Sequence, residues 1–361
     1  IMKKALILIG EAAGGHIACA RALQEAFEGT EYEATIGTVG SYDNIYLLIS
    51  RYRLLEAIFN FFCILANRFN VVSYLFSKYF VLTLSKNTRK ILEKENPDIV
   101  LSNHAMTALA IGNVKKDFNF KFIVTVPDLI TVSRVWIESK PDILFSPTKE
   151  CTQKLREYEK DIPIMEGYYP LQQIPEYSQK QRESIRENLL RSLGLEVTKP
   201  TILITGCGLG TRGIIEKMSR ILVNSKYQFI ILVGKDKRLK DELQKKYIKN
   251  SNILINGYTD RMQDFIISSD IVIAKPGPAT VLEVEGLKKK AIFTYPVGYQ
   301  EWGNVDYLIR NPNFKYIGRD FTNIQEIIDS LLSFEYENYS GEIHNSKGIV
   351  NTILEEINQS H

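Results

Sequence analysis

The chain has 361 residues and a formal net charge of +3, with 45% hydrophobic and 24% charged residues. This length predicts two domains of ordinary size, and the composition is that of a soluble globular protein. The net charge is too small to indicate nucleic-acid binding. The four cysteines are scattered without a CxxC or Cys/His pair, so we expect neither disulfides nor zinc. The same scattered cysteines fit a reducing cytoplasm. The first expected strand is too short to be a signal peptide.

Short β-branched runs alternate with amphipathic segments along most of the chain. In the first half, strands are expected at Ala5–Ile9, Ala34–Val39, Ile99–Ser102, Lys121–Val126 and Ile143–Ser146. In the second half, they are expected at Thr201–Thr205, Phe229–Val233, Ile253–Asn256, Ile271–Ala274 and Ala291–Thr294. This alternation predicts an α/β protein with doubly wound parallel sheets that helices cover on both faces.

The first expected strand ends in a glycine turn followed by a histidine. Gly14 and Gly15 would let a ligand approach the backbone closely, and His16 stands at the start of an Ala-rich helix. The positive end of that helix favours the neutral imidazole, which can accept a hydroxyl proton near neutral pH. His16 is therefore a candidate general base, and a capping or surface histidine is the alternative.

The segment from Tyr42 to Leu84 holds 11 aromatic residues in 43 positions, with sparse basic charge. Its charge-free runs are too short to span a bilayer, but helices of this composition can lie in a membrane interface. The alternative is that these helices pack against the first sheet. The expected membrane contacts are Phe59, Phe61, Phe62, Tyr74 and Phe76, which would place the protein peripherally on the inner face of the cell membrane.

The break between the domains is expected at Tyr168–Lys199, where two prolines precede a charged helix. We therefore expect an N-terminal domain at 1–170 and a C-terminal domain at 171–361, with a last helix that can pack back on the N-terminal domain. In such pairs of α/β domains, a ligand is expected in the crevice outside the carboxyl ends of the strands.

A literal GxGxxG sequence begins at Gly208 and follows an expected strand. With Asp236 as a ribose-binding acid, it would suggest a dinucleotide-dependent dehydrogenase. The spacing from Gly208 to Asp236 is 28 residues, longer than the roughly 20 expected of that fingerprint. The dehydrogenase interpretation also leaves the first glycine turn unexplained.

The segment Lys275–Gly286 predicts a tight loop that leads into a helix. The N–H groups and partial positive charge at a helix start can hold a diphosphate without a metal, here around Gly277, Pro278 and Thr280. Glu283, one turn further, can bind two vicinal hydroxyls of a ribose. The alternative is an ordinary strand–turn–helix connection. On the next loop, Gln300 and Glu301 carry groups suited to sugar hydroxyls.

Together, the Gly-Gly-His turn, the KPGPAT…E segment and the QE-x-GN loop resemble the GT-B glycosyltransferases of the monogalactosyldiacylglycerol synthase and processive diacylglycerol glucosyltransferase group. That group is related to the N-acetylglucosaminyltransferase that forms lipid II. The resemblance extends through NPDIVLSNHAMTA, VTVPDLITVSRVW, TILITGCGLG and GYTDRMQDFIISSDIVI, over roughly residues 3 to 312. One departure is that these synthases tend to carry a histidine where this chain has Ser133 or Arg134.

The resemblance implies two Rossmann-like domains facing a cleft. It also implies transfer of a hexose, with inversion, from a UDP-sugar to a membrane lipid such as diacylglycerol. One alternative is transfer of N-acetylglucosamine to a polyprenyl-linked or soluble acceptor. Another is a non-catalytic paralogue that binds lipid or UDP. Because the chain lacks an Asp-x-Asp motif, we expect no metal and no other cofactor.

The resemblance also implies roles for individual residues. His16, or alternatively Asp128, would deprotonate the acceptor hydroxyl. Gly14, Gly15 and Trp136 would lie on the acceptor or diphosphate side. The expected donor-binding residues, which include a uracil-binding backbone near 258–262, are Gly208, Gly210, Tyr258, Met262, Lys275, Gly277, Pro278, Thr280, Glu283, Gln300, Glu301 and Asn304.

Overall fold

The computed structural model describes residues 2–11, 14–41, 53–206, 212–222, 225–339 and 343–359. The chain divides into two compact units. The first unit comprises Ile1–Gln173, Gly298–Asn304 and Glu342–His361, and the second comprises Ile174–Val297 and Val305–Gly341. The first unit therefore takes in two segments from the second half of the sequence.

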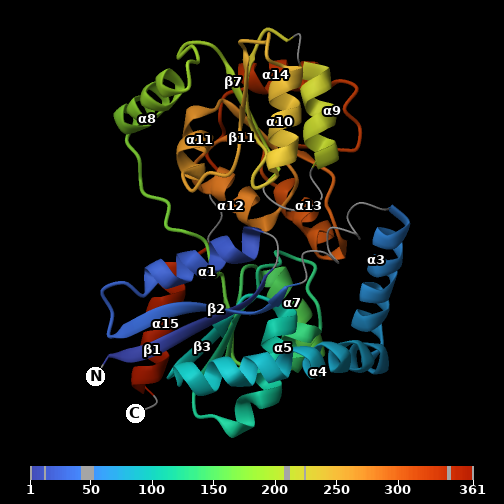
Figure 1. The fold of residues 1–361 in the computed structure, drawn as a ribbon, viewed down its shortest axis with the longest axis vertical. Coiled ribbons are helices and arrows are strands. Elements are labelled where there is room, and N and C mark those ends of the chain that lie inside the picture. The colour runs from blue at the N-terminus through green and yellow to red at the C-terminus, as the bar shows by residue number, and fades with distance from the viewer. Residues whose placement is uncertain are drawn as a thin grey trace. The chain divides into compact units, whose positions relative to one another are not determined.

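The first unit contains a six-stranded sheet in which all neighbouring strands are parallel (Figure 1). Its spatial order is β2-β1-β3-β4-β5-β6, so the chain reverses its direction of winding between β1 and β3. The strands are β1 (Lys3–Glu11), β2 (Tyr32–Ser41), β3 (Ile99–Ser102), β4 (Lys121–Thr125), β5 (Ile143–Ser146) and β6 (Ile164–Glu166).

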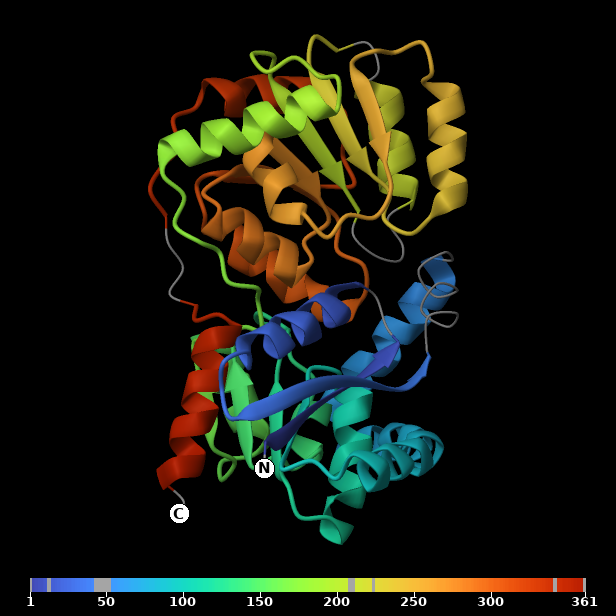
Figure 2. The ribbon, with the colours of Figure 1, turned by 60° about the vertical axis from the view of Figure 1, so that its left-hand side comes forward.

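Helices cover both faces of this sheet (Figure 2). Alternate residues of β1 enter different cores: Ala5 and Ile7 pack with α1 and α15, whereas Leu6 and Leu8 pack with α4, α5 and α7. The helices are α1 (Gly14–Ala26), α3 (Arg53–Arg68), α4 (Asn70–Glu95), α5 (Ala105–Val114), α6 (Val135–Glu138), α7 (Lys149–Tyr158) and α15 (Ser346–Gln359), with 3-10 turns η1 (Lys115–Asp117) and η2 (Tyr299–Glu301).

The second unit contains another six-stranded parallel sheet, in the order β12-β11-β10-β7-β8-β9. This is the Rossmann order, with its reversal of winding between β7 and β10. The strands are β7 (Thr201–Thr205), β8 (Gln228–Leu232), β9 (Ile253–Asn256), β10 (Ile271–Ala274), β11 (Lys290–Thr294) and β12 (Phe314–Gly318).

Helices again cover both faces of the second sheet: α9, α10 and α14 on one, and α8, α11 and α12 on the other (Figure 1). A capping box of Ser178 and Gln181 starts α8. The boundary between the units falls within α13. The helices are α8 (Gln179–Ser192), α9 (Arg212–Leu222), α10 (Lys237–Lys246), α11 (Met262–Ser268), α12 (Pro278–Gly286), α13 (Trp302–Leu308) and α14 (Ile324–Ser333).

The alternation of strands and helices confirms the predicted α/β class with parallel sheets. All ten expected strands are present, and the structure adds β6 and β12 at sheet edges. Among the described residues, no helix has a stretch long and apolar enough to cross a membrane.

Candidate active site

His16 lies in the first turn of α1, beside the point where the first sheet reverses its winding. Its Nδ1 is 2.8 Å from the backbone carbonyl oxygen of Asn103, just after β3. The Asn103 side chain in turn donates a hydrogen bond from Nδ2 to the His16 carbonyl oxygen over 2.9 Å. Because a carbonyl oxygen can only accept, His16 Nδ1 carries the proton, and in the neutral ring the lone pair is on Nε2.

The glycines before His16 form the first two residues of α1. Among the described residues, no atom lies within 4 Å of the position that a Cβ at Gly15 would occupy. The structure therefore places Gly14 and Gly15 beside the imidazole, as the sequence predicts, and their role toward a ligand stays a prediction.

His104 stands next to His16, and the sequence analysis gave it no role. The ring centroids are 5.1 Å apart and the planes are nearly perpendicular. His104 is the N-cap of α5, where its side chain accepts a hydrogen bond from the Thr107 N–H. The pKa of His104 is lowered to about 3, chiefly by burial and in smaller part by the charge of the neighbouring His16.

Asp128 lies in the connection between β4 and α6. The indole Nε1–H of Trp136 donates a hydrogen bond to its carboxylate over 3.1 Å. Burial raises the pKa of Asp128 to about 7; Trp136 opposes this shift, and the charge of Glu301 adds to it. Asp128 can therefore exchange a proton near neutral pH, and it shares its surroundings with a second carboxylate.

The loop that carries Gln300, Glu301 and Asn304 packs within the first unit. The backbone N–H of Tyr299 donates a hydrogen bond to Asn60 Oδ1 on α3 over 2.9 Å. A Cβ at Gly303 would overlap the backbone nitrogen of Thr131, so this close approach requires glycine. The structure thus groups these three residues with Asp128, whereas the sequence analysis assigned them to the C-terminal domain. Their contact with a donor stays a prediction.

In the second unit, α12 starts beside the reversal of winding, directly after β10. Gly277 is its N-cap and Pro278 its first residue, so the free backbone N–H groups of the first turn follow at once. The Gly277 N–H itself donates to the Lys275 carbonyl oxygen over 2.8 Å. Burial raises the pKa of Glu283, on the same helix, to about 7. The structure therefore brings Lys275, Gly277, Pro278, Thr280 and Glu283 together at one helix start.

Of the remaining expected donor residues in the second unit, the structure describes Tyr258 and Met262. Tyr258 is exposed after β9, where the Lys235 ammonium lies 5.7 Å from its ring centroid, and Met262 begins α11. Gly208 and Gly210 lie outside the described residues. Asp236 caps α10 by accepting a hydrogen bond from the Leu239 N–H over 2.8 Å. This cap uses the carboxylate that the dehydrogenase interpretation needs for ribose.

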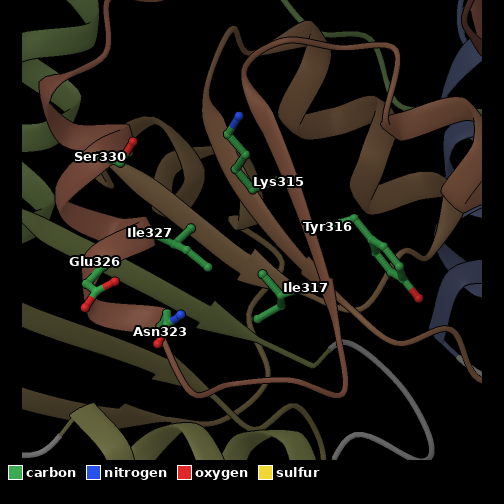
Figure 3. A pocket seen from close by; sticks show the side chains of 7 residues that line it. All are labelled: Lys315, Tyr316, Ile317, Asn323, Glu326, Ile327 and Ser330. Carbon is green, nitrogen blue, oxygen red and sulfur yellow. The ribbon is translucent and has the colours of Figure 1, made fainter.

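A hollow between β12 and α14 is also present in the second unit (Figure 3). Its side chains are mostly exposed and mixed in character. We assign it no chemistry. It is lined by Lys315, Tyr316, Ile317, Asn323, Glu326, Ile327 and Ser330.

The expected membrane residues divide into two groups. On α3, Phe61 and Phe62 are 58% and 51% exposed, and Phe59 is half-buried. Leu54 and Ile58 are exposed at helical spacing from them, which gives α3 an apolar face toward solvent. Tyr74 and Phe76 belong to α4, but their side chains lie outside the described residues.

Comparisons with known proteins agree with this architecture. Residues 16–162 match the family monogalactosyldiacylglycerol (MGDG) synthase, and residues 201–302 match the glycosyltransferase family 28 C-terminal domain. Processive diacylglycerol beta-glucosyltransferase of Staphylococcus epidermidis is 28% identical over 309 residues, which cover 81% of this chain and 75% of that protein. Monogalactosyldiacylglycerol synthase 1, chloroplastic, of Arabidopsis thaliana is 25% identical over 336 residues, covering 86% of this chain and 61% of that protein.

A solved structure extends the likeness to the fold. Acinetobacter baumannii MurG matches with a TM-score of 0.59 at 12% sequence identity, over 98% of this chain and 99% of that one. At this identity the match shows the fold alone. The two parallel sheets and this match confirm the predicted GT-B architecture of two Rossmann-like domains.

Proposed function

We propose that this glycosyltransferase, whose residues 16–162 match the MGDG synthase family and whose residues 201–302 match the glycosyltransferase family 28 C-terminal domain, moves a hexose from a UDP-sugar to a membrane lipid. Diacylglycerol is the acceptor we favour, since relatives along most of the chain are named for it. The observation that carries the proposal is His16, held with its proton on Nδ1 by the Asn103 carbonyl.

In the proposed donor site, the diphosphate binds at the start of α12. The N–H groups there and the helix dipole stabilise negative charge without a metal ion. Glu283, one turn along the same helix, accepts hydrogen bonds from the ribose hydroxyls. Its pKa of about 7 in the free protein means that ribose binding would favour the ionised carboxylate.

The proposed reaction is a single displacement with inversion. The acceptor hydroxyl oxygen forms a bond to the anomeric carbon as the bond from that carbon to the diphosphate oxygen breaks. The hydroxyl proton passes to Nε2 of His16, and UDP leaves with the new negative charge stabilised by the α12 N–H groups. Asp128 is the alternative base, because its pKa of about 7 also suits proton transfer.

We further place the acceptor at a lipid surface. The exposed apolar face of α3, with Phe61 and Phe62 at its centre, would insert into the interface of the membrane's inner leaflet, and Arg68 at the helix end would face its anionic headgroups. This gives a peripheral enzyme that meets its acceptor without leaving the bilayer surface.

A donor-by-acceptor screen on the purified full chain tests the proposal, with UDP release as the readout. The donors are UDP-glucose, UDP-galactose and UDP-N-acetylglucosamine. The acceptors are diacylglycerol in vesicles, a polyprenyl-linked sugar and a soluble sugar. We expect hexose transfer to diacylglycerol. Release of UDP only with the polyprenyl or soluble acceptor would overturn the lipid assignment, and UDP binding without release from any pair would indicate a non-catalytic paralogue.

A further inference from the structure

His16 and His104 carry their ring protons on different nitrogens. In His16, Nδ1 faces the Asn103 carbonyl oxygen at 2.8 Å and must therefore donate. In His104, Nδ1 accepts from the Thr107 N–H at 3.4 Å and lies 3.0 Å from the Thr107 hydroxyl. A nitrogen that accepts from an N–H cannot carry a proton, so the proton of neutral His104 is on Nε2.

The local sequence builds this pair from three close contacts. Asn103 and His104 are consecutive residues after β3. The same short segment therefore presents the Asn103 carbonyl oxygen to His16 and places the His104 ring beside it. Asn103 is fully buried. Gly10, at the end of β1, lies under the His104 ring: a Cβ there would be 3.0 Å from His104 Cε1. A side chain at position 10 would displace the ring.

The His104 ring is suited to a fixed, uncharged role. Burial is the main reason that its pKa falls to about 3, so it is neutral throughout the working range of most enzymes. It stands edge-on to His16, with centroids 5.1 Å apart. The ring therefore limits rotation of the His16 imidazole without competing with it for a proton.

We propose that His104 is a positioning residue that, with the Asn103 carbonyl, holds His16 in the tautomer whose Nε2 accepts the proton of the acceptor hydroxyl. The inference rests on the proposed role of His16 as the base. An imidazole in water favours the opposite tautomer, with its proton on Nε2. Without the His104 contact, the His16 ring could rotate away from the Asn103 carbonyl and lose the hydrogen bond that keeps the proton on Nδ1. Much of His16 would then carry its proton on Nε2 and could not accept a proton at that atom. Partners that orient metal-bound histidines typically contribute about ten- to a hundredfold, and we expect an effect of similar size at His16.

Nitrogen NMR of the histidine-labelled full chain tests the tautomers directly, because protonated and unprotonated ring nitrogens resonate far apart. The chain has only four histidines, so single substitutions assign the signals. At pH 7.5 we expect the Nδ1–H form for His16 and the Nε2–H form for His104. An Nε2–H form or a doubly protonated ring at His16 would overturn the proposal.

Two variants then test the dependence of His16 on His104. His104→Asn removes the ring but keeps a residue that caps helices well, and Gly10→Ala displaces the ring without changing either histidine. In both variants we expect His16 to populate both neutral tautomers and kcat to fall about ten- to a hundredfold, while UDP affinity stays unchanged. The matched control is His344→Asn, because His344 packs on Tyr168 elsewhere in the first unit. It should change neither kcat nor the His16 signals.

The outcomes separate this proposal from the proposed function. If both variants remain folded and retain the His16 tautomer and the wild-type kcat, His104 has no positioning role. If kcat falls while the His16 signals stay unchanged, the effect is structural, and the inference is again wrong. If wild-type protein transfers no sugar, the proposed function fails, while the NMR comparison still decides whether His104 fixes the tautomer.

Discussion

The Trp136 indole N–H donates a hydrogen bond to the Asp128 carboxylate over 3.1 Å, within a segment that is otherwise buried among apolar side chains. This one donor does not offset the loss of water around the carboxylate, so the pKa of Asp128 remains raised, at about 7. Because the pKa of Asp128 is raised in the folded state, the stability of the fold depends on pH as this carboxyl group titrates.

Asp128→Asn should change how stability depends on pH. The folded pKa of Asp128 is about 7, against 3.8 for the free side chain, so the folded state keeps a proton that the unfolded state has lost. The contribution of Asp128 is therefore fully present below pH 4 and is lost as pH rises toward 7. In the Asn variant, the decline in unfolding free energy between pH 5 and 7 should be smaller by about 2 kcal/mol.

Chemical denaturation of both proteins at several pH values measures this difference. The pKa of Glu283 is also raised to about 7, so its contribution to the unfolding free energy likewise falls as pH rises. His104 acts in the opposite direction, because its lowered pKa removes stability as pH falls below 6.5. These groups are common to both proteins, so parallel curves for wild type and variant would contradict the raised pKa of Asp128.

Glu283→Gln should weaken UDP binding and remove its pH dependence. For wild type, UDP at a hundredfold excess over Kd should raise the unfolding free energy by about 2.7 kcal/mol. Because the ionised carboxylate accepts the ribose hydrogen bonds, affinity should fall up to about tenfold from pH 8 to pH 6. Loss of a charge-assisted hydrogen bond costs about 1.5–3 kcal/mol.

Titration calorimetry on wild type, Glu283→Gln and Glu326→Gln checks this prediction. Glu326→Gln is the same chemical change at an exposed position of α14 (Figure 3), so the UDP affinity of this variant should match that of wild type. Stabilisation by NAD in place of UDP would instead favour the dehydrogenase interpretation of the GxGxxG sequence.

His16→Ala should lower turnover by about two to four orders of magnitude and leave UDP affinity nearly unchanged. The reason is that, in the proposed reaction, His16 Nε2 accepts the proton of the acceptor hydroxyl and does not bind the UDP-sugar. Single-turnover rates and UDP titrations on the same preparation separate the two effects. An equal loss of UDP affinity would give His16 a diphosphate-binding role and make Asp128 the better candidate base.

EDTA should leave the wild-type rate unchanged; a strict requirement for a divalent cation would contradict diphosphate binding by α12 alone.

Gly303→Ala should destabilise the first unit, because the new methyl group would overlap the Thr131 backbone. Overpacking of this kind costs about 1–3 kcal/mol. Gly213→Ala is the matched control: it lies in α9, and no described atom is within 4 Å of its added Cβ. Since alanine favours helix, it should stabilise by about 0.5–1 kcal/mol. Equal unfolding midpoints for the two variants would show that the loop at 298–304 does not pack as described.

Local sequence was sufficient to predict most elements and part of the site. The buried first strand and the glycine–proline start of α12 depend on neighbouring residues, so both were predicted correctly from the chain. Strand β6 escaped prediction because it is only three residues long, and β12 because residues 315–318 are exposed or half-buried in the structure.

The parts that escaped prediction depend on contacts distant in sequence. Asn103 holds His16 across 87 residues, and Tyr299 binds Asn60 across 239. Neither contact leaves a periodic pattern or a motif in the sequence. The NHAMTA segment was noticed only as part of the family resemblance, although a polar pair directly after a buried strand at a reversal of winding could have indicated a site.

The exposed face of α3 leads to a prediction about membrane binding. Replacing Phe61 and Phe62 by serine should weaken co-sedimentation with anionic vesicles by about a hundredfold or more, because each of the two rings contributes about 1.5–3 kcal/mol when fully inserted. Their high exposure means that thermal stability and UDP affinity should not change.

Ile248→Ser is the matched control, since Ile248 is 80% exposed in the second unit. Binding should also weaken with added salt, because basic residues near the surface are screened. Vesicle binding that survives the double substitution, or that Ile248→Ser weakens equally, would show that α3 is not the docking element.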